Sequence, residues 1–233
     1  MTQIKALFFD LDDTLHDFNR ASGTALEEVY EKIAGRYKLD KTQLKDRYSE
    51  LRKEAEEHAF LDGRLSSEYR MERFRNLLRI YNIEDEKFVA ELVHLYTKQL
   101  EKQIRPFPGI EALLSKLCQK YELYIVTEGP VDAQQRAIEI LGIKNYFKRI
   151  FISGEARKRK ATGELFAHAI KETMHSPQEI LLVGDSYKRD VLGGLKTGLK
   201  VIWVNFRNEK TQDGSPRHYY EIKDIRELGP ILL

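Results

Sequence analysis

Apolar residues follow two different patterns along the chain, and the change of pattern divides it into parts. From about 19 to 103, apolar residues recur at helical spacing with no convincing strand between them. Outside that stretch, helical patterns alternate with short apolar runs at 4–9, 123–126, 149–153, 180–183 and 199–204. Strands that alternate with helices form parallel sheets through right-handed crossovers. The pattern therefore predicts a doubly wound α/β domain with an insert of about four helices after its first strand.

The composition fits one large domain or a domain with a smaller insert, because the chain has 233 residues and 42% of them are hydrophobic. Lys and Arg total 39 against 37 Asp and Glu, and the net charge of +2 gives no electrostatic case for nucleic acid or membrane partners. The single cysteine, Cys118, excludes an internal disulfide. The chain has no signal-peptide pattern and no run of membrane-spanning length. We therefore expect a cytoplasmic protein, monomeric or homodimeric.

Three carboxylates follow the first predicted strand within four residues: Asp10, Asp12 and Asp13. Such a cluster is unfavourable inside a core, because like charges repel and each loses its hydration. The cluster therefore indicates either a solvated turn or a cation site. In open α/β sheets the carboxyl ends of the strands are where ligands bind.

Other predicted strands end in polar residues of related kinds. Thr127 ends the second strand, and Asp185 ends a later one, with Asp190 five residues on. A basic run at 157–160, which includes Lys160, lies between them. Because the carboxyl ends of parallel strands share one edge of the sheet, we expect acids, a hydroxyl and a lysine around one point.

The chemistry that such a set can perform is narrow. Several aspartate oxygens suit Mg²⁺, which keeps waters and substrate phosphate among its ligands. A carboxylate can also attack phosphorus and form an aspartyl-phosphate. Mg²⁺ and a lysine would cancel the repulsion between that nucleophile and an anionic phosphate. A hydroxyl and backbone N–H groups would bind the remaining phosphoryl oxygens.

Four segments resemble the signatures of the haloacid dehalogenase-like hydrolases, in the family's order. Segment 10–15, Asp-Leu-Asp-Asp-Thr-Leu, resembles the first signature, Asp-x-Asp-x-Thr-Leu. Thr127 resembles the second, Lys160 the third, and segment 184–190, Gly-Asp-Ser-x-x-x-Asp, the fourth. The resemblance implies a Rossmann-like catalytic core over 1–16 and 104–233, with a helical cap over 17–103.

The resemblance also implies roles for the signature residues. Asp10 would be the nucleophile, and Asp12 would protonate the leaving alcohol and later activate water. Thr127, the residue after it and Lys160 would hold the phosphoryl group. An aspartate at position 12 argues against dehalogenation, because a leaving halide needs no proton.

The metal site implied by the resemblance holds Mg²⁺. Its ligands would be Asp10, Asp185 and the backbone carbonyl of Asp12. Asp190 would support these ligands or bind the ion itself.

The chain departs from the family pattern at two positions. Glu128 replaces the usual Asn after Thr127, and Ala161 replaces the usual Pro after Lys160, which leaves Lys158 as a rival phosphate-binding lysine. A carboxylate about 5 Å from a phosphate dianion would be repelled by roughly 7 kcal/mol at a dielectric of about 20. We therefore expect Glu128 to contact the phosphate through its backbone N–H, with its side chain turned away.

Some polar residues are interpreted as structural. Asp13 is expected to make local hydrogen bonds in its loop. His16, His58 and His94 are not assigned to a site, because none has a partner at metal-ligand spacing.

The resemblance implies a Mg²⁺-dependent phosphatase that acts on a small phosphorylated metabolite. Relatives with this cap type act on sugar phosphates, phosphoglycolate, glyceraldehyde 3-phosphate and nucleoside monophosphates. Closure of the cap would exclude water and select the substrate. Two alternatives stay open: a phosphotransferase of the sugar-phosphate mutase type, and a non-enzymatic binding protein with the same fold.

Overall fold

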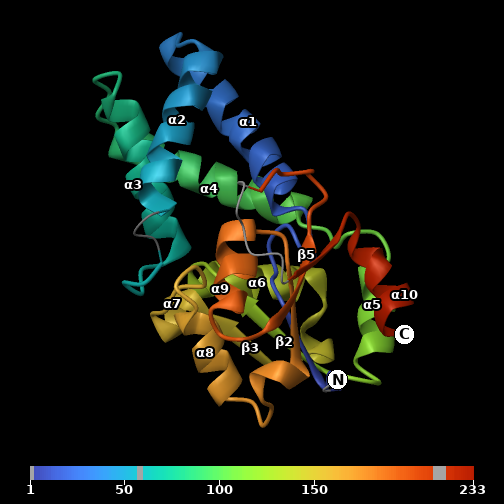
Figure 1. Cartoon of the computed structure of the whole chain (residues 1–233). Coiled ribbons are helices and arrows are strands. Elements are labelled where there is room, and N and C mark those ends of the chain that lie inside the picture. The colour runs from blue at the N-terminus through green and yellow to red at the C-terminus, as the bar shows by residue number, and fades with distance from the viewer. Residues whose placement is uncertain (1–2, 57–59, 212–218) are drawn as a thin grey trace.

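A single parallel sheet forms the centre of the molecule. The computed structural model describes residues 3–56, 60–211 and 219–233. Within them, six strands have the order β3-β2-β1-β4-β5-β6, and each neighbouring pair is parallel. Figure 1 shows the sheet in the lower part of the view, below helices α1 to α4, which lie within residues 18–103. The strands are β1 (Ala6–Phe9), β2 (Glu122–Thr127), β3 (Arg149–Ile152), β4 (Ile180–Gly184), β5 (Lys200–Val204) and β6 (Tyr219–Ile222). His58 lies outside the described residues.

The first strand is central, and its neighbours end nearly level with it. Phe9, the last residue of β1, pairs with Ile125 of β2 on one side and with Val183 of β4 on the other. The residues that follow these three strands therefore lie at one edge of the sheet, as the strand pattern predicted.

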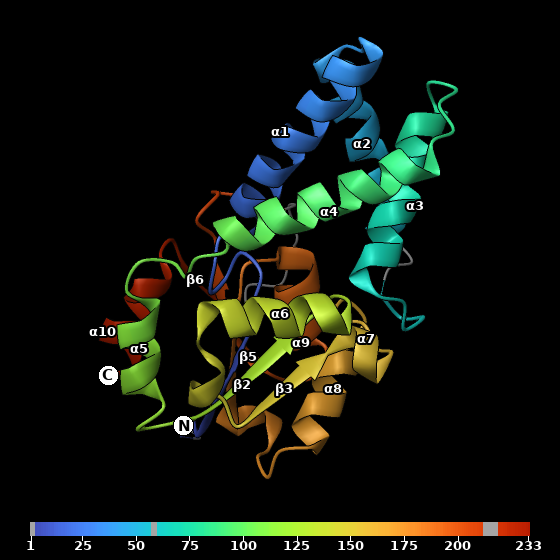
Figure 2. The ribbon, with the colours of Figure 1, turned by 180° about the vertical axis from the view of Figure 1, so that it is seen from behind.

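Helices cover both faces of the sheet. Successive residues of β1 point to opposite faces, so each face presents apolar side chains to the helices that cover it. Phe8 packs with Phe166 in one apolar cluster, and Phe9 packs with Ile138 in another. Helices α8 and α9 are nearest the viewer in Figure 1, and α6 lies in front of the sheet in the reverse view of Figure 2. The core helices are α5 (Ile110–Leu117), α6 (Val131–Leu141), α7 (Ser153–Ala156), α8 (Glu164–Lys171), α9 (Leu192–Leu195) and α10 (Leu228–Leu232). The predicted doubly wound α/β fold is confirmed.

Shorter helical turns join these elements. Three are 3₁₀ turns, at Lys144–Tyr146, Pro177–Glu179 and Ile225–Glu227. A π-helical turn at Tyr187–Val191 follows β4.

Among the described residues, four helices lie between β1 and α5, in the segment for which an all-helical cap is predicted. They are α1 (Phe18–Tyr37), α2 (Lys41–Glu56), α3 (Ser66–Arg79) and α4 (Glu86–Gln103). The Asp17 side chain accepts from the N–H of Arg20 at the start of α1, and Asp85 caps α4 through the N–H of Phe88. The boundaries of the cap at 17–103 stay a prediction. Among the described residues, no helix has the length and apolar character to cross a membrane.

The helical segment contacts the core at its linkers and on α6. Phe107 donates a backbone hydrogen bond of 3.0 Å to the carbonyl of Leu15, which joins the two linkers. Ser66 at the start of α3 donates from its N–H (2.9 Å) and its hydroxyl (2.7 Å) to the two carboxylate oxygens of Asp132 on α6. These contacts hold the helices over the edge of the sheet where the candidate site lies (Figure 2).

Candidate active site

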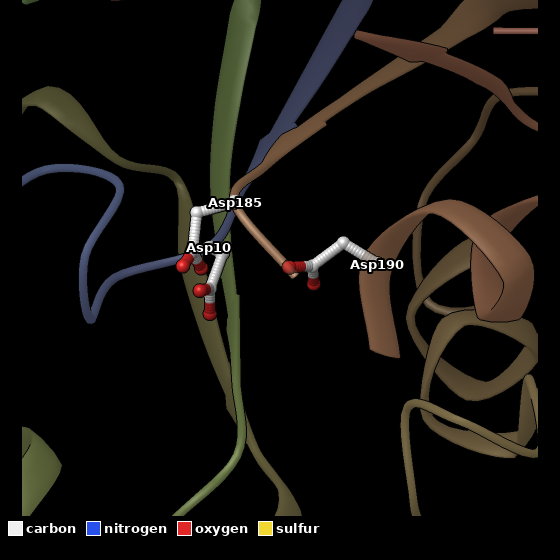
Figure 3. A group of neighbouring side chains, drawn as sticks. All are labelled: Asp10, Asp185 and Asp190. Atoms are coloured by element: carbon white, nitrogen blue, oxygen red, sulfur yellow. The ribbon is translucent and has the colours of Figure 1, made fainter. Parts of the chain in front are cut away.

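Three buried aspartates converge at the carboxyl edge of the sheet. The N–H of Asp10 donates to the carbonyl of Val183 (2.9 Å), which continues the β1–β4 ladder and places the Asp10 side chain at the strand end. One carboxylate oxygen from each of Asp10, Asp185 and Asp190 lies within 4.8 Å of the others. Figure 3 shows Asp10 and Asp185 side by side at the strand ends, with Asp190 pointing toward them from the helix that follows β4.

Asp190 reaches this group because the chain turns tightly after β4. In the π-helical turn, the N–H of Asp190 donates to the carbonyl of Ser186 (2.8 Å), and Asp190 Oδ2 accepts from the N–H of Ser186 (3.0 Å). A Cβ at Gly184 would lie 2.4 Å from Cγ of Asp190, a distance that real side chains do not tolerate. The glycine of the fourth signature is therefore required for the approach of Asp190.

Lys160 supplies the positive charge of the site. Its ammonium contacts Oδ1 of Asp10 and lies 2.7 Å from Oδ1 of Asp190, and the residue is only 1% exposed. Burial alone would lower the pKa of Lys160, but the charges of Asp10 and Asp190 outweigh it and raise that pKa above its ordinary value. The lysine therefore stays protonated, and Lys160 rather than Lys158 makes these contacts.

The carboxylates have the character of a divalent-cation site. Burial raises the pKa of Asp10 to about 7, against the charge of Lys160. Burial, together with the charges of Asp10 and Asp190, raises the pKa of Asp185 to about 8. Oδ1 of Asp185 is buried without a hydrogen-bond partner among the described residues. An all-oxygen group with an unpartnered carboxylate oxygen fits a hard cation such as Mg²⁺.

The carboxylate of Asp12 lies apart from that group and is held by two donors. Nε2 of His16 is 2.9 Å from its Oδ1, and Nε2 of Gln134 donates to its Oδ2 at 3.1 Å. Burial would raise the pKa of Asp12, but these hydrogen bonds lower it below its ordinary value. The structure thus favours ionised Asp12. The expected use of its backbone carbonyl as a metal ligand stays a prediction.

The residues of the second signature make contacts on either side of the site. Thr127 Oγ1 donates to Oε1 of Gln134 (2.7 Å), so Gln134 connects Thr127 with Asp12. Glu128 Oε1 accepts from the backbone N–H of Lys160 (3.2 Å). The side chain of Glu128 therefore points toward the loop of the third signature. Its expected backbone contact with phosphate stays a prediction.

Asp13 makes local contacts, as interpreted from the sequence. It adopts a left-handed conformation (φ 61°) and accepts from the N–H (2.9 Å) and the amide (2.7 Å) of Asn19. Arg207, three residues beyond β5, lies 3.1 Å from Oδ1 of Asp13 and 3.5 Å from Oδ2 of Asp185. This arginine connects the turn before α1 with the carboxylate group.

Sequence reasoning missed three residues of the site: His16, Gln134 and Arg207. His16 was not assigned to a site from the sequence, but the turn after β1 folds back and brings its ring to Asp12. Its sequence signal was a four-residue offset from Asp12. Gln134 had a weaker signal, its place in the first turns of the helix after Thr127. Arg207 had none.

A family profile and the sequences of known proteins place the chain in the same family. The profile of the family described as "Haloacid dehalogenase-like hydrolase" matches residues 7–204. The chain is 30% identical to HAD-hydrolase YfnB of Bacillus subtilis, over 100% of this chain and 97% of that protein. It is 26% identical to N-acylneuraminate-9-phosphatase of Mus musculus (100% and 95%) and 30% identical to pyrimidine 5'-nucleotidase PynA of Streptococcus pneumoniae (96% and 93%).

A solved structure agrees with these sequence matches. The magnesium-bound crystal structure of YfnB superposes with a TM-score of 0.78 at 30% identity and covers 99% of both chains. A profile match over residues 7–204 and a relative of this identity along the whole chain establish the family. Together with the four signatures at one edge of the sheet, they show that this chain is an enzyme of the haloacid dehalogenase-like hydrolase family.

Proposed function

We propose that the protein is a Mg²⁺-dependent phosphatase that hydrolyses a small phosphorylated metabolite through an aspartyl-phosphate on Asp10. The observation that carries the proposal is the buried group of Asp10, Asp185 and Asp190 with Lys160 among them. A carboxylate nucleophile, a cation site and a fixed ammonium are what phosphoryl transfer to a carboxylate requires.

Mg²⁺ would be held by Asp10, Asp185, Asp190 and the backbone carbonyl of Asp12, and would supply positive charge beside the phosphate oxygens. Lys160 neutralises the charge that builds up on the transferring phosphoryl group, because its ammonium is fixed next to Asp10. The Thr127 hydroxyl, by turning its proton from Gln134 to the phosphate, and the backbone N–H of Glu128 would complete the binding of the phosphoryl oxygens.

In the first half of the reaction, a carboxylate oxygen of Asp10 attacks phosphorus. The bond from phosphorus to the leaving oxygen breaks. Asp12, which is ionised in the free protein, must first take up a proton from solvent, and it gives that proton to the leaving oxygen. In the second half, ionised Asp12 takes a proton from water, whose oxygen attacks phosphorus. The bond to Asp10 then breaks and inorganic phosphate leaves. The hydrogen bonds from His16 and Gln134 favour the ionised form of Asp12, which is the form that the second half uses.

The relatives suggest the class of substrate. N-acylneuraminate-9-phosphatase and pyrimidine 5'-nucleotidase are named for small phosphorylated metabolites. Helices α1 to α4 stand over the carboxyl edge of the sheet in Figure 2, in the position of a lid that selects by size. We therefore propose a small metabolite phosphate, not a phosphoprotein, as the substrate.

A screen of phosphorylated metabolites tests the proposal. The wild type is assayed for release of inorganic phosphate with Mg²⁺ and with EDTA, and Asp10→Asn serves as the matched control. We expect Mg²⁺-dependent release from at least one sugar phosphate, phosphoglycolate, glyceraldehyde 3-phosphate or nucleoside monophosphate. Equal release with EDTA, or from Asp10→Asn, would contradict the mechanism. Isomerised sugar phosphate in place of inorganic phosphate would instead identify a phosphotransferase.

A further inference from the structure

The carboxylate of Asp12 is bound on both oxygens by residues that no signature includes. His16 Nε2 lies 2.9 Å from Oδ1, and Gln134 Nε2 lies 3.1 Å from Oδ2. The His16 ring is fully buried, and Gln134 is only 5% exposed. Gln134 also accepts from the hydroxyl of Thr127 (2.7 Å). One amide thus joins the candidate acid/base to the candidate phosphate-binding hydroxyl.

The surroundings of His16 fix which ring nitrogen carries the proton. A carboxylate oxygen accepts hydrogen bonds, so Nε2 must donate to Asp12. Nδ1 is buried and has no partner among the described residues. A proton on Nδ1 would be a buried donor without an acceptor, which costs about 1–3 kcal/mol. The arrangement therefore favours a ring that donates from Nε2 to Asp12.

The backbone of His16 fixes the position of the ring. Its carbonyl accepts from the N–H groups of Asp13 (2.8 Å) and Phe18 (3.1 Å), and the residue bridges to Asp12 and to Pro106 on the other linker. The His16 ring contacts the Phe18 ring edge-on, with 6.2 Å between the two ring centroids. His16 is therefore a rigid donor rather than a side chain that can follow Asp12.

We propose that His16 and Gln134 are positioning residues that hold the Asp12 carboxylate in the orientation from which it exchanges protons with the leaving alcohol and with water. This inference rests on the proposed function. An acid/base on a free side chain would occupy several rotamers, and only a fraction of them would be within hydrogen-bond reach of the reacting oxygen. Two donors on opposite oxygens select one rotamer before substrate binds.

Matched variants separate the hydrogen bond from simple packing. His16→Leu keeps an apolar side chain but removes the donor. His16→Gln places an amide N–H at about the same distance from the backbone as Nε2, and so restores a donor to Asp12. Gln134→Met keeps the length of the side chain and removes the amide, both the Nε2 donor to Asp12 and the Oε1 acceptor from Thr127. Each variant is compared with the wild type by thermal melting before kinetics, and Gln134→Met makes the test if His16→Leu fails to fold.

The readout is single-turnover phosphorylation of the enzyme by an alkyl phosphate and by an aryl phosphate with a good leaving group. The alkyl substrate needs protonation of its leaving oxygen, and the aryl substrate needs it much less. We expect His16→Leu to lose roughly tenfold or more in the alkyl reaction, with the aryl reaction within about threefold of wild type and KM nearly unchanged. His16→Gln should recover most of the loss.

A double-mutant cycle of His16 and Asp12 is the second test of the proposal. In an Asp12→Asn background, His16→Leu should add less than about twofold to the loss, because both changes disable the same group. Equal losses with the alkyl and aryl substrates, or additive losses in the cycle, would overturn the inference and leave His16 a packing residue.

Nitrogen NMR of the imidazole tests the same contact without any substrate. We expect the Nε2–H tautomer in the wild type and a changed Nε2 shift in Asp12→Asn. A resting Nδ1–H tautomer would overturn the inference. Absence of all phosphatase activity in the wild type would instead refute the proposed function, so the two failures are distinguishable.

Discussion

Oε1 of Glu128 accepts a hydrogen bond of 3.2 Å from the backbone N–H of Lys160. This contact joins the loop after β2 to the loop that carries Lys160. The residue at position 128, where the family usually has Asn, thus has a structural partner of its own. The contact explains how a carboxylate can stand next to a candidate phosphate site, because its side chain is engaged with the neighbouring loop.

Substitutions at Glu128 test that contact. Glu128→Gln keeps an oxygen that can accept from Lys160, so we expect Mg²⁺ dependence and phosphoenzyme formation to be retained. Glu128→Ala removes the acceptor and should lower kcat by roughly tenfold, because it loosens the Lys160 loop. Both variants are compared with the wild type by steady-state kinetics and by inhibition with inorganic phosphate. A tenfold or greater gain in phosphate affinity in Glu128→Gln would mean that the carboxylate faces the phosphate.

The two candidate phosphate-binding lysines, Lys158 and Lys160, should respond differently, because Lys160 is the one that contacts Asp10 and Asp190. Lys160→Ala leaves Asp10 and Asp190 without their shared cation, and we expect kcat/KM to fall by at least about a hundredfold. Lys158→Ala is the matched control and should stay within about threefold of wild type. The opposite order of effects, measured under the same conditions, would show that Lys158 is the phosphate-binding residue.

Gly193 allows the backbone of Lys160 to approach α9. An added Cβ there would lie 2.1 Å from the carbonyl oxygen of Lys160, so the loop would have to move. We expect Gly193→Ala to destabilise the fold by about 1–3 kcal/mol and to lower kcat/KM. Gly35, at an exposed position of α1, has no atom within 4 Å of such a Cβ, and Gly35→Ala should stabilise by about 0.5–1 kcal/mol. Urea unfolding measures the stability of both variants. Equal changes in the free energy of unfolding would contradict the close approach of Gly193 to Lys160.

The raised pKa values of Asp10 and Asp185 predict how stability and metal binding change with pH. In the unfolded chain these groups lose their protons near the ordinary value of 3.8, whereas in the metal-free fold they keep them until about 7 and about 8. Between those values the fold binds more protons than the unfolded chain, so these groups lower its stability as pH rises. Mg²⁺ must displace the same protons, and so should bind more tightly at higher pH.

Thermal melting with Mg²⁺ and with EDTA tests this linkage. The rise in Tm on adding Mg²⁺ should be larger at about pH 8.5 than at about pH 6. Asp185→Asn should lose most of that difference, because it removes the group with the higher of the two pKa values. An equal rise in the Tm of the wild type at the two pH values would show that these carboxylates do not bind the ion.

The sequence predicts those features that depend on local pattern. Buried parallel strands appear as short apolar runs, and the shared edge of a parallel sheet then brings Asp10, Thr127 and Asp185 together without any knowledge of side-chain contacts. Strand β6 escaped prediction because Tyr219–Ile222 has only one buried position, at Ile222, and no apolar run.

The contacts around Asp12 could not be predicted in the same way. The approach of His16 depends on a turn in which Asp13 adopts a left-handed conformation, and the approach of Gln134 depends on how α6 packs beside β2. Arg207 reaches Asp185 from the loop after the neighbouring strand β5. These are tertiary relationships between segments that are distant in sequence or joined by irregular turns. Hydrophobic period and residue spacing are not sufficient to predict them.

The most direct test of the central claim is to trap the phosphoenzyme. Wild type and Asp10→Asn are mixed with a substrate from the screen that carries a radiolabelled phosphate, in Mg²⁺, and are quenched in acid within the first turnover. We expect an acid-stable, hydroxylamine-labile label on the wild type, with peptide mapping to Asp10, and none on Asp10→Asn. A label on another residue, or rapid turnover by Asp10→Asn, would contradict covalent catalysis by Asp10.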